Sequence, residues 1–179
     1  MSATTPTTIR PAVAADLDAI LRIYNDAILT TTATWDEAAW TMQQRIAWFT
    51  THDPLQPVLV AQVQGAVAGF AYLTRMSDKS GWRFTREDTI YLDPPFHGQG
   101  IGRLLLGALL DEARTLGLRL IVASITTENA ASLALHRALG FQTMGTLHNA
   151  GFKFGRWLDT TYMQLDLGPP AASHRQDLV

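Results

Sequence analysis

Hydrophobic positions recur with a helical period in some stretches and as short β-prone runs in others, and this pattern predicts the elements of the chain. Apolar residues at helical spacing predict an amphipathic helix over residues 16–28 and a second from about 37 to 49. Two short apolar runs follow at 58–63 and 66–73, and Gln64-Gly65 between them is typical of a tight turn. The first half therefore predicts two helices followed by a β-hairpin.

The second half of the chain alternates strands with helices. A polar loop over 74–84 separates the hairpin from the next predicted strand. The later elements are a strand over 85–92, a helix over 103–116, a buried strand over 120–125, a helix over 130–139 and two strands over 141–147 and 161–167. This order favours an α/β or α+β fold in which helices cover a single mixed sheet. We expect a flexible leader over 1–8, one domain over 9–167 and a tail over 168–179.

Composition limits the classes of partner. The 179 residues, of which 47% are hydrophobic, suffice for one packed core, and no apolar run approaches the roughly 20 residues of a membrane span. The formal charge of -2 is interspersed along the chain, which argues against nucleic-acid binding. The absence of cysteine and the five scattered histidines predict no thiol chemistry and no metal site. We expect a cytoplasmic protein whose partner is a small molecule.

A glycine-rich turn after the strand over 85–92 is the most informative local feature. The run His97-Gly98-Gln99-Gly100-Ile101-Gly102 leads directly into a leucine-rich helix. Its glycines let the backbone approach a ligand, and the free amides of the helix start favour an anion such as a pyrophosphate. Taken alone, the turn is also an ordinary strand-to-helix connection. It lacks the G-x-G-x-x-G spacing of dinucleotide-binding turns and the lysine of a Walker loop.

Three other segments, together with this turn, carry a resemblance to a known family. They are Tyr24-Asn25-Asp26-Ala27, the run over 128–141, and Gly151-Phe152-Lys153-Phe154-Gly155-Arg156-Trp157-Leu158-Asp159. Over roughly residues 9–167 the chain resembles the GNAT acetyltransferases, and within them the phosphinothricin and methionine-sulfoximine N-acetyltransferases. The resemblance implies the GNAT fold, with a mixed, mostly antiparallel central sheet flanked by helices, and acetyl-CoA as co-substrate without a metal.

The family's glycine turn wraps the pyrophosphate of acetyl-CoA, and His97 here replaces the Gln or Arg with which that turn begins. Asn129 lies at a strand-to-helix break, where it is an ordinary helix cap, the family's contact to the pantetheine arm, or both. The resemblance implies that the cofactor contacts Ile90, Tyr91, Leu92, His97, Gly98, Gln99, Gly100, Ile101, Gly102, Arg103, Asn129 and Ser132.

The implied reaction is direct attack of a primary amine on the thioester of acetyl-CoA within a ternary complex. An alkylamine has a pKa of about 10.4, so it arrives protonated and a base must remove the proton. Glu87 is the candidate, because the segment over 83–91 resembles the one that bears the family's catalytic glutamate. From the residues alone, Glu87 is instead a solvent-facing carboxylate paired with Arg83 or Arg86. As a base it needs partial burial to raise its pKa, or a water that relays the proton.

Two residues are candidates for the later steps. The family stabilises the oxyanion with a backbone amide on the same strand, which corresponds here to Leu92. His136 stands where many members have tyrosine and the phosphinothricin group has histidine, and it is either an acid for the thiolate or a histidine packed near the cofactor. Because a thiol has a pKa near about 8.5 and leaves readily, loss of Glu87 should hurt more than loss of His136.

The implied substrate is a small, amino-acid-like amine. Its carboxylate needs a cation and its side chain an apolar wall. The methionine-sulfoximine enzymes carry Trp-Arg where this chain has Met76-Ser77, so Arg75 or Arg83 would have to supply the cation, unless both are solvated charges. Asp88 should point to the opposite face of the strand from Glu87. The candidate substrate residues are Trp35, Arg75, Arg83, Glu87, Asp88 and Thr89.

Two other functions fit the same residues. A peptide or protein N-acetyltransferase would use the same chemistry in an open groove, and a noncatalytic acetyl-CoA-binding module would keep the turn and Asn129 without needing Glu87. The long polar loop over 74–84 favours a closed pocket, and Glu87 on its strand favours catalysis. The family commonly forms dimers with the site near the interface, which implies a homodimer.

Overall fold

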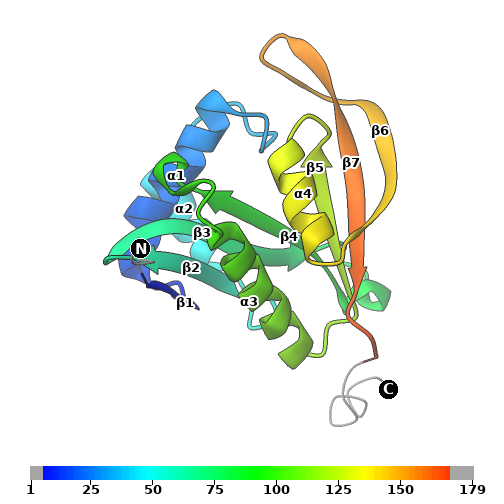
Figure 1. The fold of residues 1–179 in the computed structure, drawn as a ribbon, viewed down its shortest axis with the longest axis horizontal. Coiled ribbons are helices and arrows are strands. Elements are labelled where there is room, and N and C mark those ends of the chain that lie inside the picture. The colour runs from blue at the N-terminus through cyan, green and yellow to red at the C-terminus, as the bar shows by residue number, and fades with distance from the viewer. Residues whose placement is uncertain (1–5, 170–179) are drawn as a thin grey trace, which may run out of the picture.

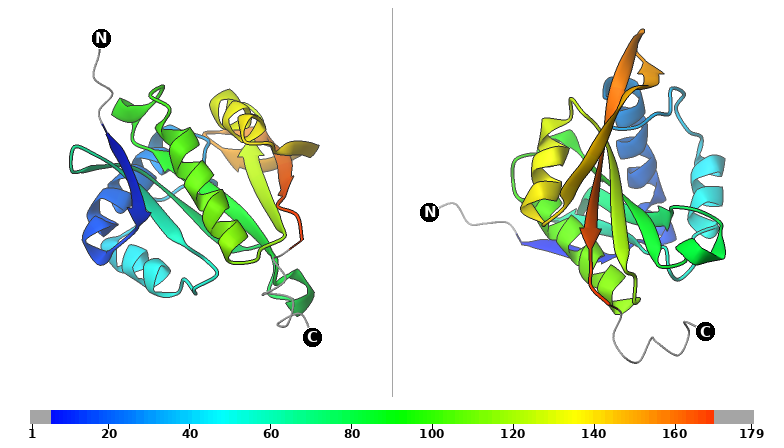
Figure 2. Two further views of the ribbon diagram at one scale, coloured as in Figure 1. Left: turned by 60° about the horizontal axis from the view of Figure 1, so that its bottom comes forward. Right: turned by 90° about the vertical axis from the view of Figure 1, so that its right-hand side faces the viewer.

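The computed structural model describes residues 6–169, which form one mixed sheet with helices on both faces (Figures 1 and 2). The strand order within these residues is β1-β2-β3-β4-β5-β7-β6, and β4 and β5 are the parallel pair. The strands are β1 (Thr7–Pro11), β2 (Val58–Val63), β3 (Ala66–Arg75), β4 (Thr85–Leu92), β5 (Leu120–Thr126), β6 (Gln142–Lys153) and β7 (Arg156–Asp166). The α-helices are α1 (Leu17–Thr30), α2 (Met42–Thr50), α3 (Ile101–Thr115) and α4 (Ala130–Ala138). The expected mixed, mostly antiparallel sheet is confirmed.

Side-chain alternation along the strands divides the core into two layers. On one face, Val60 of β2 and Phe70 of β3 pack against the buried side of α1, and Trp40 and Trp48 cover this layer. On the other face, the residues that alternate with them, such as Leu59 of β2 and Ala71 of β3, pack against α3. The buried leucines of α3 are Leu105, Leu106, Leu109 and Leu110. Among residues 6–169, none of the helices is long and apolar enough to cross a membrane.

The centre of the sheet opens between β4 and β5. These strands pair only where residues 85–87 face residues 120–122, and beyond this point they diverge (Figure 1). β4 nevertheless stays paired with β3 as far as Leu92. The end of β4 therefore has a strand neighbour on one side and none on the other.

The predicted strand over 85–92 and the predicted hairpin turn at Gln64-Gly65 are confirmed. The predicted ends of two helices are confirmed as well. Gly117 and Gly140 follow α3 and α4 with φ of 72° and 94°, which is the left-handed conformation that closes a helix and that glycine adopts without strain.

The prediction that a helix begins at about residue 37 is wrong, because α2 begins at Met42. Thr41 caps it: its hydroxyl accepts from the Gln44 amide, and the Gln44 side chain accepts from the Thr41 amide. The preceding residues are held by contacts with α1 instead. Asn25 bonds both the amide and the carbonyl of Trp40, at 2.8 and 2.9 Å. Such tertiary contacts outweigh the local helical pattern.

Two further differences concern strands. The apolar pattern did not predict β1, which pairs with the edge of β2 and includes Thr7 and Thr8 at the end of the predicted leader. β6 and β7 are longer than the predicted strands over 141–147 and 161–167, and they join in a tight turn at Phe154-Gly155. Their outer parts are exposed, so no alternation of buried residues marks them in the sequence. The predicted tail falls largely outside the described residues.

Candidate active site

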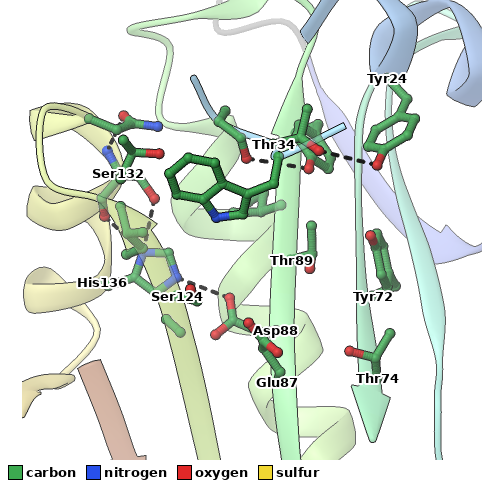
Figure 3. A pocket seen from close by; sticks show the side chains of 18 of the residues that line it. Tyr24, Thr34, Tyr72, Thr74, Glu87, Asp88, Thr89, Ser124, Ser132 and His136 are labelled. Atoms are coloured by element: carbon green, nitrogen blue, oxygen red, sulfur yellow. Dashed lines mark hydrogen bonds and ion pairs between the residues drawn. The ribbon is translucent and has the colours of Figure 1, made fainter. Parts of the chain in front are cut away.

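Two adjoining cavities lie where β4 and β5 diverge. The inner cavity, of about 280 Å³, lies between β4 and β5 and reaches Tyr24 of α1 and His136 of α4 (Figure 3). The outer groove, of about 570 Å³, lies between the glycine turn and the start of α4. Both are bordered by Ala33, Ile90, Tyr91, Asn129 and Ser132. A molecule in the outer groove can therefore reach the inner cavity along β4.

The glycine turn is built to expose backbone amides. Gly98 and Gly100 have φ of 72° and 79°, and Gly100 is the N-cap of α3 without a side-chain cap. The first two amides of α3, those of Ile101 and Gly102, precede the helical hydrogen bonds and can face an anion, whereas the Arg103 amide already donates to the Gly100 carbonyl. His97 does not extend over the turn, since its Nε2 lies 3.1 Å from the Leu92 carbonyl and donates to it. The His97 imidazole is therefore engaged with β4, and the turn presents mainly its backbone to the outer groove.

The remaining predicted cofactor residues are distributed unevenly. Gly102 and Arg103 border the outer groove, whereas the Ile101 side chain is buried in the core and the Gln99 side chain donates to Pro95. Across the groove, Asn129 caps α4: its side chain accepts from the Ser132 amide at 3.1 Å. The cap fixes the Asn129 side chain at a position that borders both spaces. Asn129 can therefore act as a helix cap and contact a pantetheine arm in the same conformation.

Glu87 lies at the last position at which β4 pairs with β5; it faces Thr74 of β3 and borders the inner cavity. Burial raises the pKa of its carboxyl, and the neighbouring charge of Asp88 raises that pKa further. A carboxylate with a raised pKa is a stronger base than one in water. Glu87 thus has the property that the sequence argument required of a base.

The Asp88 side chain points from β4 toward α4, where it forms a buried pair with His136, and Asp88 borders the inner cavity together with Glu87. The distance from Oδ2 to Nε2 is 3.0 Å, and both side chains are almost completely buried. Nδ1 of His136 lies 2.7 Å from the Ser132 carbonyl, so this nitrogen carries a proton. Burial lowers the pKa of His136, but the hydrogen bond and charge of Asp88 outweigh burial and raise it overall. Both ring nitrogens are therefore engaged within the protein.

Leu92, the predicted oxyanion residue, is held closely against β3. It faces Gly69, where an added Cβ would lie 2.4 Å from Leu92 Cδ2 and 2.6 Å from the Tyr91 carbonyl oxygen. No larger residue fits there without movement of β4. Together with the His97 contact to its carbonyl, this packing fixes the backbone of Leu92 at the edge of the outer groove.

Loop 31–36 borders both spaces and is held at several points. Lys153 of β6, which is 1% exposed, donates from Nζ to the Thr34 carbonyl at 2.8 Å, and burial lowers its pKa. Thr126 of β5 donates to the Thr32 carbonyl. Tyr24 donates to Asp36 at 2.7 Å. Sequence reasoning assigned no role to Lys153, although it belongs to one of the segments that carried the family resemblance.

The predicted substrate residues divide into two groups. Trp35, Glu87, Asp88 and Thr89 all border the inner cavity. Arg75 instead pairs with Asp53 at 2.6 Å. Arg83 donates to the Ser80 carbonyl and lies over the Phe84 ring, and neither arginine borders the inner cavity. Sequence reasoning also missed two hydroxyls of this cavity, those of Tyr24 and Tyr72.

Comparison with known proteins agrees with this architecture. Residues 20–141 match the acetyltransferase (GNAT) family. The L-methionine sulfoximine/L-methionine sulfone acetyltransferase of Salmonella typhimurium is 44% identical, covering 92% of this chain and 97% of its own. A GNAT superfamily phosphinothricin acetyltransferase from Sinorhizobium meliloti, solved with acetyl-CoA, is 42% identical with a TM-score of 0.88, over 93% and 91% of the two chains. A ribosomal-protein-alanine N-acetyltransferase from Brucella melitensis is 43% identical with a TM-score of 0.87, over 89% and 99%.

The chain belongs to the GNAT acetyltransferase family. It is an acyltransferase with the GNAT fold, as the sequence resemblance implied.

Proposed function

We propose that the protein transfers the acetyl group of acetyl-CoA to the primary amine of a small, amino-acid-like molecule by direct attack in a ternary complex. The observation that carries the proposal is the position of Glu87. It lies in the inner cavity, its pKa is raised, and the cavity joins an outer groove that ends at the glycine turn. Two relatives are named as a methionine sulfoximine acetyltransferase and a phosphinothricin acetyltransferase, and these names support this class of substrate.

Each part of the site has a role in this reaction. The amides after Gly100 hold the pyrophosphate, and Asn129 contacts the pantetheine arm. When bound, acetyl-CoA supplies an activated acetyl group. Glu87 takes the proton that the substrate ammonium loses, directly or through a water, which frees the nitrogen lone pair for attack. The Leu92 amide donates to the oxyanion that forms on the thioester oxygen. As the sulfur leaves as a thiolate, the nitrogen loses its second proton to the thiolate or to solvent, which leaves a neutral amide and requires no metal.

The inner cavity supports a small substrate rather than a protein chain. Its volume of about 280 Å³ leaves room for an amino acid. Contacts from Lys153 and Tyr24 hold loop 31–36 at the border of this cavity. The similarity to a ribosomal-protein-alanine N-acetyltransferase keeps a peptide N-terminus as a second candidate. A panel of amines separates the two, because the proposal expects thiol release with L-methionine sulfoximine and with phosphinothricin but not with an alanine-initiated peptide. Release with the peptide alone would reverse the assignment.

The role of Glu87 is tested by Glu87→Gln, which keeps the shape of the side chain and removes the base. We expect kcat to fall by about 10²-fold. In the wild type, kcat/KM should increase with pH as the Glu87 carboxyl, whose pKa is raised by burial, loses its proton. The variant should lack this acidic limb. Activity within a few fold of the wild type would transfer the role to another group. A suitable control is Glu112→Gln on the exposed side of α3, which should leave the rate unchanged.

We further propose that the protein acts in the cytoplasm as a homodimer. The hairpin of β6 and β7 supports a dimer, because it displays large apolar side chains that are between 50% and 63% exposed: Met144, Leu147, Phe152, Phe154 and Trp157. Light scattering tests it. A dimer that dissociates in Trp157→Glu would support the assignment, and a monomeric wild type would reject it.

A further inference from the structure

One carboxylate oxygen of a residue that borders the inner cavity is buried without a hydrogen-bond partner. It is Oδ1 of Asp88, whose other oxygen is bonded to His136. The Asp88 side chain is 1% exposed, and among the residues that the structure describes Oδ1 meets no donor. Buried polar atoms are nearly always bonded, because an unmet carboxylate oxygen has lost its water without compensation. Such an atom beside a cavity indicates a ligand that brings a donor.

The charge of the pair defines which donor fits. Nδ1 of His136 must carry a proton to bond the Ser132 carbonyl, so one more proton is shared between Nε2 and Asp88 Oδ2. The pair is therefore an imidazolium beside a carboxylate, and its negative member, Asp88, is one of the residues that border the inner cavity. The second carboxyl of this cavity, Glu87, is the next residue on β4. A cavity bordered by two carboxyl-bearing residues favours a cation.

We propose that Asp88 Oδ1 binds the ammonium group of the substrate and orients its nitrogen toward the thioester. This inference rests on the proposed function and deepens it, since it names the atom that selects a charged amine. An ammonium has several N–H donors. One donates to Asp88 Oδ1, and another passes its proton to Glu87, where the N–H bond breaks and a carboxyl O–H bond forms. The freed lone pair then attacks the acetyl carbon.

In this arrangement His136 is a positioning residue and not the acid for the leaving thiolate. Its two nitrogens are bonded to Ser132 and Asp88, and the ring is 2% exposed. By holding Oδ2, it leaves Oδ1 as the oxygen without a partner. Of the two roles left open by the sequence, the geometry favours the packed histidine, with an added function through Asp88.

Asp88→Asn tests the inference, because asparagine keeps the volume and an oxygen acceptor but loses the charge. The probe is L-methionine sulfone, and its 2-hydroxy analogue, in which a hydroxyl replaces the amine, is the matched ligand. Calorimetric titration of the CoA-saturated protein gives both dissociation constants. We expect the variant to bind the amine roughly 10- to 100-fold more weakly, as is typical of a lost bond to a charged group, and the hydroxy acid about as well as the wild type. Asp111→Asn, on the exposed side of α3, is the control.

Equal affinity of wild type and Asp88→Asn for the amine would overturn the inference, and so would an equal loss for both ligands. If the asparagine variant does not fold, Asp88→Ser gives the same comparison with room for a water beside His136. The proposed function is tested separately by thiol release from the wild type across the amine panel. If the wild type turns over another amine instead, that amine replaces the sulfone as probe, and its KM should be roughly 10- to 100-fold higher in Asp88→Asn than in the wild type. Turnover with an unaltered KM in the variant would refute the role of Asp88 alone, and no turnover with any amine would refute both proposals.

Discussion

Gly151 on β6 allows Trp35 to lie against the backbone of the hairpin, and its substitution by alanine should impair amine binding specifically. An added Cβ at this position would lie 2.2 Å from Trp35 Cζ3, 2.5 Å from Cε3 and 2.7 Å from Cη2. Ordinary carbon–carbon contact needs about 3.5 Å, so the ring must move by roughly 1 Å or more. Trp35 is 39% exposed and can move outward, which limits the loss of stability. The cost should therefore stay within about 1–3 kcal/mol of unfolding free energy.

The larger effect of Gly151→Ala should be on the inner cavity, which Trp35 borders. A displacement of about 1 Å in a substrate-positioning group can cost up to 10²-fold in rate. We expect kcat/KM for the amine to fall at least about 10-fold while the KM for acetyl-CoA stays unchanged, as measured by thiol release with each substrate varied in turn. Gly145→Ala, on the same strand with nothing within 4 Å of the added Cβ, is the control and should behave as the wild type. Identical amine kinetics in the two variants would refute the reasoning.

Three further outcomes follow from single contacts. Gly100→Ala places a Cβ on a residue with φ of 79°, so the unfolding free energy should fall by about 1–2 kcal/mol. The KM for acetyl-CoA should also rise, and an unchanged KM would show that the turn does not hold the co-substrate. Thr41→Ala removes the cap of α2 and should lower stability by about 1 kcal/mol in a urea titration without altering kcat, whereas unaltered stability would contradict the capping role. The folded-state pKa of His136 is raised by Asp88, so the pair's contribution to stability should be complete below the unfolded value of about 6.5 and be lost as pH rises through the folded value. His136→Gln should lack that pH dependence, and a stability profile identical to the wild type would exclude a charged pair.

Local signals were sufficient for much of the fold. The strand over 85–92 has β-prone residues between polar loops, and the helix closures at Gly117 and Gly140 depend on glycine's own conformational freedom. The start of α2 was mispredicted because hydrogen bonds from Asn25 to Trp40 act across the chain. β1 was missed because a short edge strand is stabilised by the strand beside it and not by its own pattern.

Within the candidate site, the glycine turn and the Asn129 cap were predictable, because each depends on residues that are close in the sequence. The site was less predictable where it depends on contacts between residues that are far apart in the sequence. Asp88 and His136 are 48 residues apart, and no periodicity indicates that they meet. Likewise, Lys153 reaches Thr34 across 119 residues. Arg75 and Arg83, the two arginines considered as replacements for the one missing at Met76-Ser77, both lie outside the inner cavity.

The separation of β4 from β5 gives the sheet an edge in its interior. Alternate residues from 88 to 92 turn backbone amides and carbonyls toward the space that β5 has left. An extended ligand with amide groups, such as the pantetheine arm, can pair with such an edge as an added strand would. The co-substrate would then complete the sheet and stabilise the fold by mass action. In the absence of the co-substrate, amide hydrogens of this inner segment should exchange faster than those of the fully paired strand β3. The sheet would then have labile backbone at its centre as well as at its edges.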